Sequence, residues 1–286
     1  MKKRFLLLLP LLCLTACSYG VDPDKPFDNV YLIMGQSNAS GCSKASFLET
    51  KDPETYAKYK NGFNNVEITY DVDDHVNKSY VPVHFGIANT EEFFGPEIGI
   101  SDVLSTVNEK SYIIKASWSG SSLQADYVNK DGDTFKLYDR FVPFIKKQLK
   151  NLQKEGKNPR VRGLFWMQGE SDSWEGLCDN YGPALEWFVK KMREELNDYV
   201  YEYMNFVDAY ISTKTIWTFS EKVNAAKQNF SNETLHNYCF KTNGEDENAI
   251  DLGIKAQTGE DPNDWAHYDS ISMVALGREA GKYLIK

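Results

Sequence analysis

The chain has 286 residues, of which 42% are hydrophobic and 14% aromatic, so it is long enough to bury a large core within one domain. Its formal net charge is −9 and no basic cluster stands against this acidic balance, which excludes nucleic acid as an expected partner. The five cysteines include no Cys-x-x-Cys pair, so no structural zinc site is expected.

The chain begins with the pattern of an exported protein. Three basic residues precede the apolar run 5–14, which is too short to span a bilayer as a stable helix, and Leu14-Thr15-Ala16-Cys17 follows. Small residues before a cysteine at this point resemble the signal of bacterial lipoproteins. We therefore expect residues 1–16 to be removed as a signal peptide and Cys17 to be lipidated. The alternative is a plain secretory peptide that is cut nearby.

Lipid on Cys17 would anchor the mature protein to a bacterial membrane, and we expect the outer membrane or cell surface rather than the inner membrane. Residues 17–27 would then form the tether. Loss of the three basic residues, with no acidic residue removed, would change the net charge from −9 to −12. Cys42, Cys178 and Cys239 would remain as thiols, and their disulfide pairing is left open.

The first structured segment is expected at Val30–Met34, a continuous apolar run that is typical of a buried strand in a parallel sheet. It ends at Gly35, and the small polar residues Gln36, Ser37 and Asn38 follow. A serine on a tight turn after a buried strand lies at the carboxyl edge of the sheet, where open α/β folds place their chemistry. The alternative is an ordinary turn.

Later segments alternate in the same way. Apolar runs predict strands and 3.6-residue periodicity predicts helices, which together favour an α/β fold. We expect a three-layer α/β/α sandwich with a central, mainly parallel sheet, in one domain over residues 28–286. The expected strands are 81–87, 111–116, 161–167, 205–211 and 249–254, and the expected helices are 95–108, 135–155, 181–196, 220–230 and a last helix capped by Ser270.

Four polar clusters occupy loops after strands or before the last helix: 35–38, 120–121, 168–170 and 264–267. Acyl transfer needs a nucleophile, a base that takes its proton and a carboxylate that orients the base. Ser37, His267 and Asp264 supply these groups. The developing oxyanion needs hydrogen-bond donors, and three candidates are the Ser37 N–H, the Gly120 N–H and the side-chain amide of Gln168.

The motifs Gly-Gln-Ser-Asn, Gln-Gly-Glu-Ser-Asp and Asp-x-x-His, in this order, resemble the SGNH hydrolase superfamily, and within it the sialic-acid-type acetylesterase domain (carbohydrate esterase family 6). The resemblance covers residues 28–286 and implies a flavodoxin-like sandwich. It also implies Ser37 as nucleophile, His267 as base and Asp264 as its acid, with Gly120 and Gln168 completing the oxyanion hole. The chain departs from the pattern at Ser119, where these enzymes often have glycine, and after Asn38.

Two assignments have rivals. Glu170 is an alternative to Asp264 as the acid, because the choice of carboxylate varies among triads. His236 is an alternative base, although its neighbours are typical of core packing. We expect substrate contacts from side chains beside the catalytic turns, namely Gln36, Asn38, Glu170, Trp118 and Trp265. Tyr127 and Trp174 are further candidates for stacking on sugar rings.

These features predict an esterase that removes O-acetyl groups from a carbohydrate such as sialic acid or xylan, with no metal and no organic cofactor. Two other readings remain open. One is a lipase or thioesterase of the same superfamily, although no long apolar stretch beside the motifs indicates an acyl-chain groove. The other is a surface lipoprotein that binds glycans and has lost activity. The intact serine, aspartate and histidine disfavour the second reading.

Overall fold

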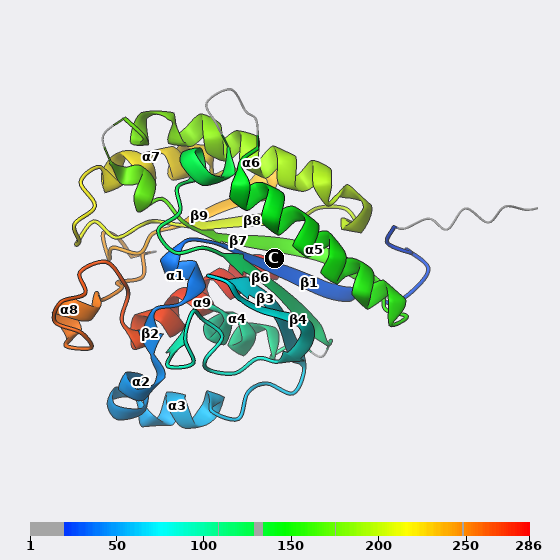
Figure 1. The fold of residues 1–286 in the computed structure, drawn as a ribbon, viewed down its shortest axis with the longest axis horizontal. Coiled ribbons are helices and arrows are strands. Elements are labelled where there is room, and N and C mark those ends of the chain that lie inside the picture. The colour runs from blue at the N-terminus through cyan, green and yellow to red at the C-terminus, as the bar shows by residue number, and fades with distance from the viewer. Residues whose placement is uncertain (1–19, 108, 129–133, 175, 248) are drawn as a thin grey trace, which may run out of the picture.

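The structure is a computed structural model that describes residues 20–107, 109–128, 134–174, 176–247 and 249–286 (Figure 1). The predicted signal peptide and the lipidation site Cys17 lie outside the described residues. Within the described part of the chain, no helix combines the length and the apolar character needed to cross a membrane.

A seven-stranded sheet forms the centre, in the order β4-β3-β6-β1-β7-β8-β9, and all neighbouring strands are parallel except the β3–β4 pair at one edge. β1 is central and buried, as its apolar run predicts. The strands are β1 (Asp28–Gly35), β3 (Val66–Val72), β4 (His75–Pro82), β6 (Ser111–Ser117), β7 (Pro159–Met167), β8 (Asn205–Ala209) and β9 (Asn237–Phe240); β2 (Ser43–Lys44) and β5 (Phe93–Phe94) form a separate ribbon.

Helices cover both faces of the sheet, so the predicted three-layer α/β/α sandwich is confirmed (Figure 1). One face carries α5 (Lys136–Lys154), α6 (Tyr181–Glu195) and α7 (Ser220–Phe230). The other carries α4 (Glu97–Leu104) and α9 (Ser270–Leu284), which approach so closely that a Cβ on Gly99 would lie 2.2 Å from the Val274 oxygen. The short helices are α1 (Ser37–Ser40), α2 (Ala45–Lys51), α3 (Pro53–Tyr59) and α8 (Lys255–Thr258).

Three local predictions are wrong. The sequence pattern predicts neither β3 nor most of β4. β4 is an exposed edge strand, and its polar sequence lacks the pattern of a buried strand. β3 is buried, but Glu67, Thr69 and Asp71 separate its apolar residues. The last strand is β9 and not 249–254, where the described backbone forms only isolated bridges. The N-cap of α9 is Asp269, which accepts a hydrogen bond from the Ser272 N–H at 2.7 Å. Ser270 instead donates to Glu260.

Candidate active site

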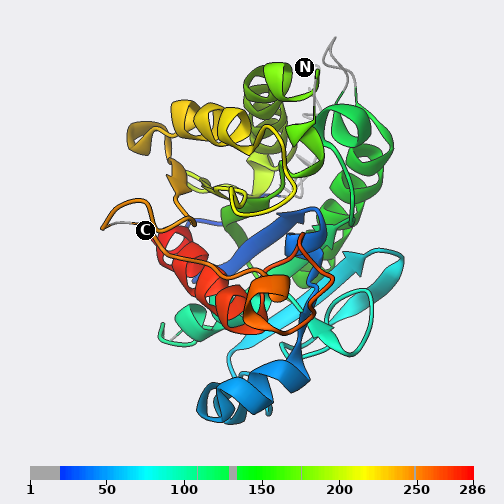
Figure 2. The ribbon, with the colours of Figure 1, turned by 90° about the vertical axis from the view of Figure 1, so that its left-hand side faces the viewer.

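The serine turn lies where β1 ends. Gly35 has φ = +141°, and a Cβ there would lie 2.0 Å from the Met167 carbonyl oxygen, so this position requires glycine. Ser37 is the first residue of α1 and is 7% exposed. Gly35 is in register with Ser117 of β6 and Met167 of β7, so the loops after all three strands meet at this edge. Figure 2 looks toward the side of the molecule on which α1 lies.

Asp264 and His267 lie on the loop between α8 and α9 and contact each other directly. His267 Nδ1 is 3.0 Å from each carboxylate oxygen of Asp264. Asp264 Oδ1 also accepts hydrogen bonds from the backbone N–H groups of Ala266 and His267, at 3.1 and 3.2 Å. The carboxylate therefore fixes both the loop and the ring, and Nε2 is the nitrogen left for another partner.

Contacts between neighbouring residues bring this loop to the serine turn. The Tyr268 N–H donates to Asn38 Oδ1 at 3.3 Å, and Ser43 Oγ donates to the Tyr268 carbonyl at 2.9 Å. The thiol of Cys42 interacts with the His267 ring and lies 3.6 Å from the Ser37 carbonyl oxygen. The structure thus brings together the predicted nucleophile, base and acid at one edge of the sheet.

Asp264 and His267 shift each other's pKa. Burial lowers the pKa of the His267 imidazole, but the hydrogen-bonded carboxylate of Asp264 and the nearby Cys42 have the larger combined effect and raise the pKa above its ordinary value. Burial raises the pKa of Asp264, but hydrogen bonds from His267 and Lys255 more than reverse this and hold it well below its usual range. Asp264 is therefore an ionised carboxylate that favours the protonated imidazole.

Glu170, the rival acid, has a different partner. Its Oε1 accepts a hydrogen bond from Asn38 Nδ2 at 2.8 Å, and Oε2 is buried without a hydrogen-bond partner among the described residues. Burial raises the pKa of this carboxyl group. The carboxylate that contacts His267 is thus Asp264, while Glu170 lies beneath the serine turn. The catalytic roles of both groups stay predictions.

Three predicted site residues are buried and hold loops together. Gln36 Oε1 accepts hydrogen bonds from Gln168 Nε2 and the Ser171 N–H, both at 3.1 Å, and Asn38 links Glu170 to Tyr268. Gln168 Nε2 also donates to Asp172 at 2.6 Å. Gln36, Asn38 and the Gln168 amide therefore make contacts within the protein, and their roles in substrate binding and the oxyanion hole stay predictions.

Two backbone N–H groups at this edge are predicted as oxyanion donors, those of Ser37 and Gly120. Ser37 opens α1, and the first N–H groups of a helix have no partner within it. Gly120 has φ = +70°, and a Cβ there would meet no heavy atom within 4 Å, so the space beside it is open. We find no acceptor for the Gly120 N–H among the described residues.

The aromatic candidates differ in exposure. Trp118 is partly buried, and the Arg140 guanidinium lies over its ring at 4.8 Å, while Tyr127 is fully buried. Neither offers a free face to a sugar. Trp265, between Asp264 and His267, is 47% exposed, and Trp174, in the loop after β7, is 46% exposed. Trp174 meets Trp217 edge-on, with ring centroids 6.2 Å apart.

His236 is remote from this edge. It directly precedes β9, so it lies at the amino end of a strand that runs parallel, through β8 and β7, to β1. Its ring stacks on Tyr203 with a centroid distance of 3.9 Å. This position excludes His236 as the base for Ser37.

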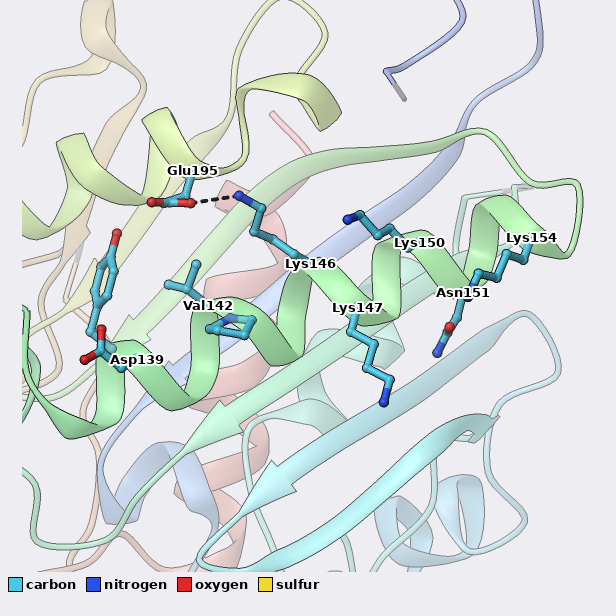
Figure 3. A pocket seen from close by; sticks show the side chains of 10 residues that line it. Asp139, Val142, Lys146, Lys147, Lys150, Asn151, Lys154 and Glu195 are labelled. Atoms are coloured by element: carbon cyan, nitrogen blue, oxygen red, sulfur yellow. Dashed lines mark hydrogen bonds and ion pairs between the residues drawn. The ribbon is translucent and has the colours of Figure 1, made fainter. Parts of the chain in front are cut away.

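A cavity of about 580 Å³ also lies away from the triad (Figure 3). It follows α5, where Lys146, Lys147, Lys150 and Lys154 line it, and Lys146 pairs with Glu195 at 2.8 Å. None of the predicted catalytic residues lines this cavity. The active-site assignment therefore rests on the chemistry of the loops at the carboxyl edge.

Lys255 lies at the site, although its sequence context does not predict it there. The ammonium of Lys255, in α8, lies 2.9 Å from Asp264 Oδ2 and is only 3% exposed. A lysine in a polar helix normally indicates a solvated surface, so no sequence pattern distinguishes Lys255 from the many exposed lysines of this chain.

Residues 27–286 match the family described as "Carbohydrate esterase, sialic acid-specific acetylesterase". No protein of curated function matches the chain.

Among solved structures, a protein from Arabidopsis thaliana aligns with a TM-score of 0.66 at 16% identity, over 91% of this chain and 98% of that one. NanS aligns with a TM-score of 0.62 at 14% identity, over 91% and 97%. A carbohydrate acetylesterase from Xanthomonas citri aligns with a TM-score of 0.54 at 14% identity, over 89% and 55%. These TM-scores show a shared fold.

Proposed function

Because the chain belongs to the carbohydrate esterase family of sialic acid-specific acetylesterases, we propose that it removes O-acetyl groups from a carbohydrate with Ser37 as nucleophile. The observation that carries the proposal is the Asp264–His267 pair, 3.0 Å apart, held beside the turn that bears Ser37. No step of this reaction requires a metal or an organic cofactor.

The mechanism follows from the groups at the sheet edge. His267 accepts the proton of Ser37 Oγ as the oxygen attacks the acetyl carbonyl, and Asp264 stabilises the resulting imidazolium. The N–H groups of Ser37 and Gly120 donate to the oxyanion. His267 then gives this proton to the departing sugar oxygen. The sugar leaves with a free hydroxyl, and Ser37 carries the acetyl group. Water, activated by the same histidine, attacks the acetyl-serine and releases acetate.

Acetate release from a panel of acetylated glycans tests this function. The panel includes O-acetylated sialic acid, acetylated xylan and acetylated pectin, with a long-chain acyl ester and an acyl thioester as comparisons. We expect acetate from at least one glycan, and little product from the long-chain ester or the thioester. Turnover of the comparison esters alone would favour a lipase or thioesterase. Glycan binding without any ester hydrolysis would favour an inactive binding protein.

We also propose that Trp174 and Trp265 contact the sugar, because both are about half exposed and lie on loops at the carboxyl edge. Trp174→Ala should raise KM for the preferred glycan by about threefold to tenfold, the loss of one aromatic stacking contact, with little change in kcat. Turnover of 4-nitrophenyl acetate, which has no sugar ring, should be unchanged.

Tyr201→Ala is the matched control for Trp174→Ala. Tyr201 is an exposed aromatic residue that precedes β8, at the opposite edge of the sheet, so KM should not change. An unchanged KM in both variants would mean that Trp174 does not bind substrate.

For the amino-terminal region we propose export and lipidation of Cys17, which would anchor the protein at the outer membrane or cell surface. Leu14-Thr15-Ala16-Cys17 after a basic start and an apolar run supports this proposal. Cys17→Ala should abolish incorporation of radiolabelled palmitate and release the protein from the membrane fraction. If the unchanged chain carries no label and fractionates as soluble protein, the anchor proposal fails, and the esterase proposal is unaffected.

A further inference from the structure

Lys255 links the acid of the triad to the loop that follows the nucleophile. Its ammonium lies 2.9 Å from Asp264 Oδ2 and donates to the Cys42 carbonyl oxygen, also at 2.9 Å. Cys42 follows α1, the helix that Ser37 opens. The side chain is buried, so its position is fixed by these contacts and not by solvent.

The first turn of α8 is held to the same loop by two backbone hydrogen bonds. The Lys255 N–H donates to the His267 carbonyl at 3.0 Å, and the Ala256 N–H donates to the Asp264 carbonyl at 2.9 Å. A second carboxylate, Glu260, is 3.9 Å from the ammonium but already accepts hydrogen bonds from Ser270 and from the Lys44 N–H. Asp264 is therefore the principal counter-charge of Lys255.

We propose that Lys255 is a positioning residue of the catalytic pair, which holds the Asp264 carboxylate against His267 and offsets part of its negative charge. The inference rests on the proposed function, because it assigns Lys255 a role in the same triad.

The charged groups around His267 explain why a cation beside Asp264 affects the pKa of the imidazole. The ring faces Asp264 on its own loop, the Cys42 thiol from the loop after α1, and the buried Glu170 from the loop after β7. The Asp264 carboxylate raises the pKa of the imidazole, and a general base must be neutral to accept a proton. A cation on the far side of Asp264 opposes that rise, so the imidazole is neutral at a lower pH than it would be without Lys255.

Proton NMR of the histidine rings in the full chain tests the inference without reference to activity. His267→Gln identifies the His267 signal among the four histidines. Lys255→Gln removes the charge but keeps a donor for the Cys42 carbonyl, and it should raise the His267 titration midpoint by about one pH unit. Lys255→Arg keeps the charge and should leave the midpoint within about 0.3 units. A midpoint that stays the same or falls in Lys255→Gln would overturn the proposal.

The pH profile of kcat/KM provides the functional readout. Its acid limb reports the base of the free enzyme, so in Lys255→Gln it should move to higher pH by the same amount as the NMR midpoint. Lys115→Gln is the control, because Lys115 forms a fully buried ion pair with Glu97, at 2.6 Å, outside the triad. It should lower the melting temperature without moving either midpoint.

A second comparison applies if Lys255→Gln does not fold. The double variant Lys255→Gln/Asp264→Asn removes both partners of the Lys255–Asp264 ion pair, whereas Asp264→Asn alone leaves the cation. The His267 midpoint should be about one unit lower in the single variant than in the double variant, and equal midpoints would overturn the inference. If instead Ser37→Ala were fully active, the proposed function would fail while the NMR result for Lys255 stood.

Discussion

Ser37→Ala is expected to reduce kcat on an acetate ester by a factor on the order of 10⁵ to 10⁶, because the proposed acetyl-enzyme cannot form without the Ser37 hydroxyl. The melting temperature should stay nearly the same, since the Ser37 side chain makes no hydrogen bond that the described structure contains. Initial rates on 4-nitrophenyl acetate, with a thermal melt of each sample, provide the measurement. A serine-directed phosphonate should label the unchanged protein at Ser37 alone.

Ser40→Ala is the matched control on the same helix. Ser40 is also buried, and its hydroxyl bonds to Ser117 Oγ at 3.1 Å, away from the Asp264–His267 pair. This variant should lose about 1 kcal/mol of unfolding free energy and keep most of its turnover. Near-normal turnover of Ser37→Ala would remove Ser37 from the mechanism.

Asp264→Asn should lower kcat by about 10⁴, the cost of losing the carboxylate that fixes the histidine tautomer in a well-studied serine triad. Glu170→Gln should cost less than about tenfold, because glutamine keeps an oxygen that can accept the Asn38 hydrogen bond, the one side-chain hydrogen bond of this carboxyl group within the described structure. In Asp264→Asn, KM should change much less than kcat, which is the pattern of lost transition-state stabilisation.

Steady-state kinetics on one acetate ester for both carboxylate variants decide between the acids. If Glu170→Gln lost more turnover than Asp264→Asn, Glu170 would be the acid and the contact between Asp264 and His267 would be structural. The reaction class would stand in either case.

The sequence predicts the buried part of this fold well and its edges poorly. β1, β6 and β7 are covered on both faces and each contains a run of apolar residues, so their ends can be located within two residues. β3 is buried as well, but Glu67, Thr69 and Asp71 interrupt its apolar residues. β4 has water on one side and β9 is only four residues long, so neither carries a pattern that stands out from a loop.

The candidate site shows a similar limit. The three motifs predict which side chains meet, because parallel strands bring the loops that follow them to one edge of the sheet. They do not predict which polar side chains form hydrogen bonds within the protein. Gln36, Asn38 and Gln168 carry groups suited to ligand binding, yet all three are buried and bond to neighbouring loops. Lys255 was missed for the opposite reason, since only the tertiary structure reveals that this lysine is buried against a carboxylate.

The segment that precedes β1 and the serine turn lie at opposite ends of this strand. The segment before β1 is held at the amino edge, where the Asp22 N–H donates to Asn158 at 2.9 Å and the Val21 N–H donates to the Asp198 carbonyl at 3.0 Å. Ser37 follows the other end of an eight-residue strand, roughly 23 Å away at about 3.3 Å per residue. If Cys17 carries a lipid as proposed, the segment that leads from the lipid and the edge that bears Ser37 would therefore lie at opposite ends of β1.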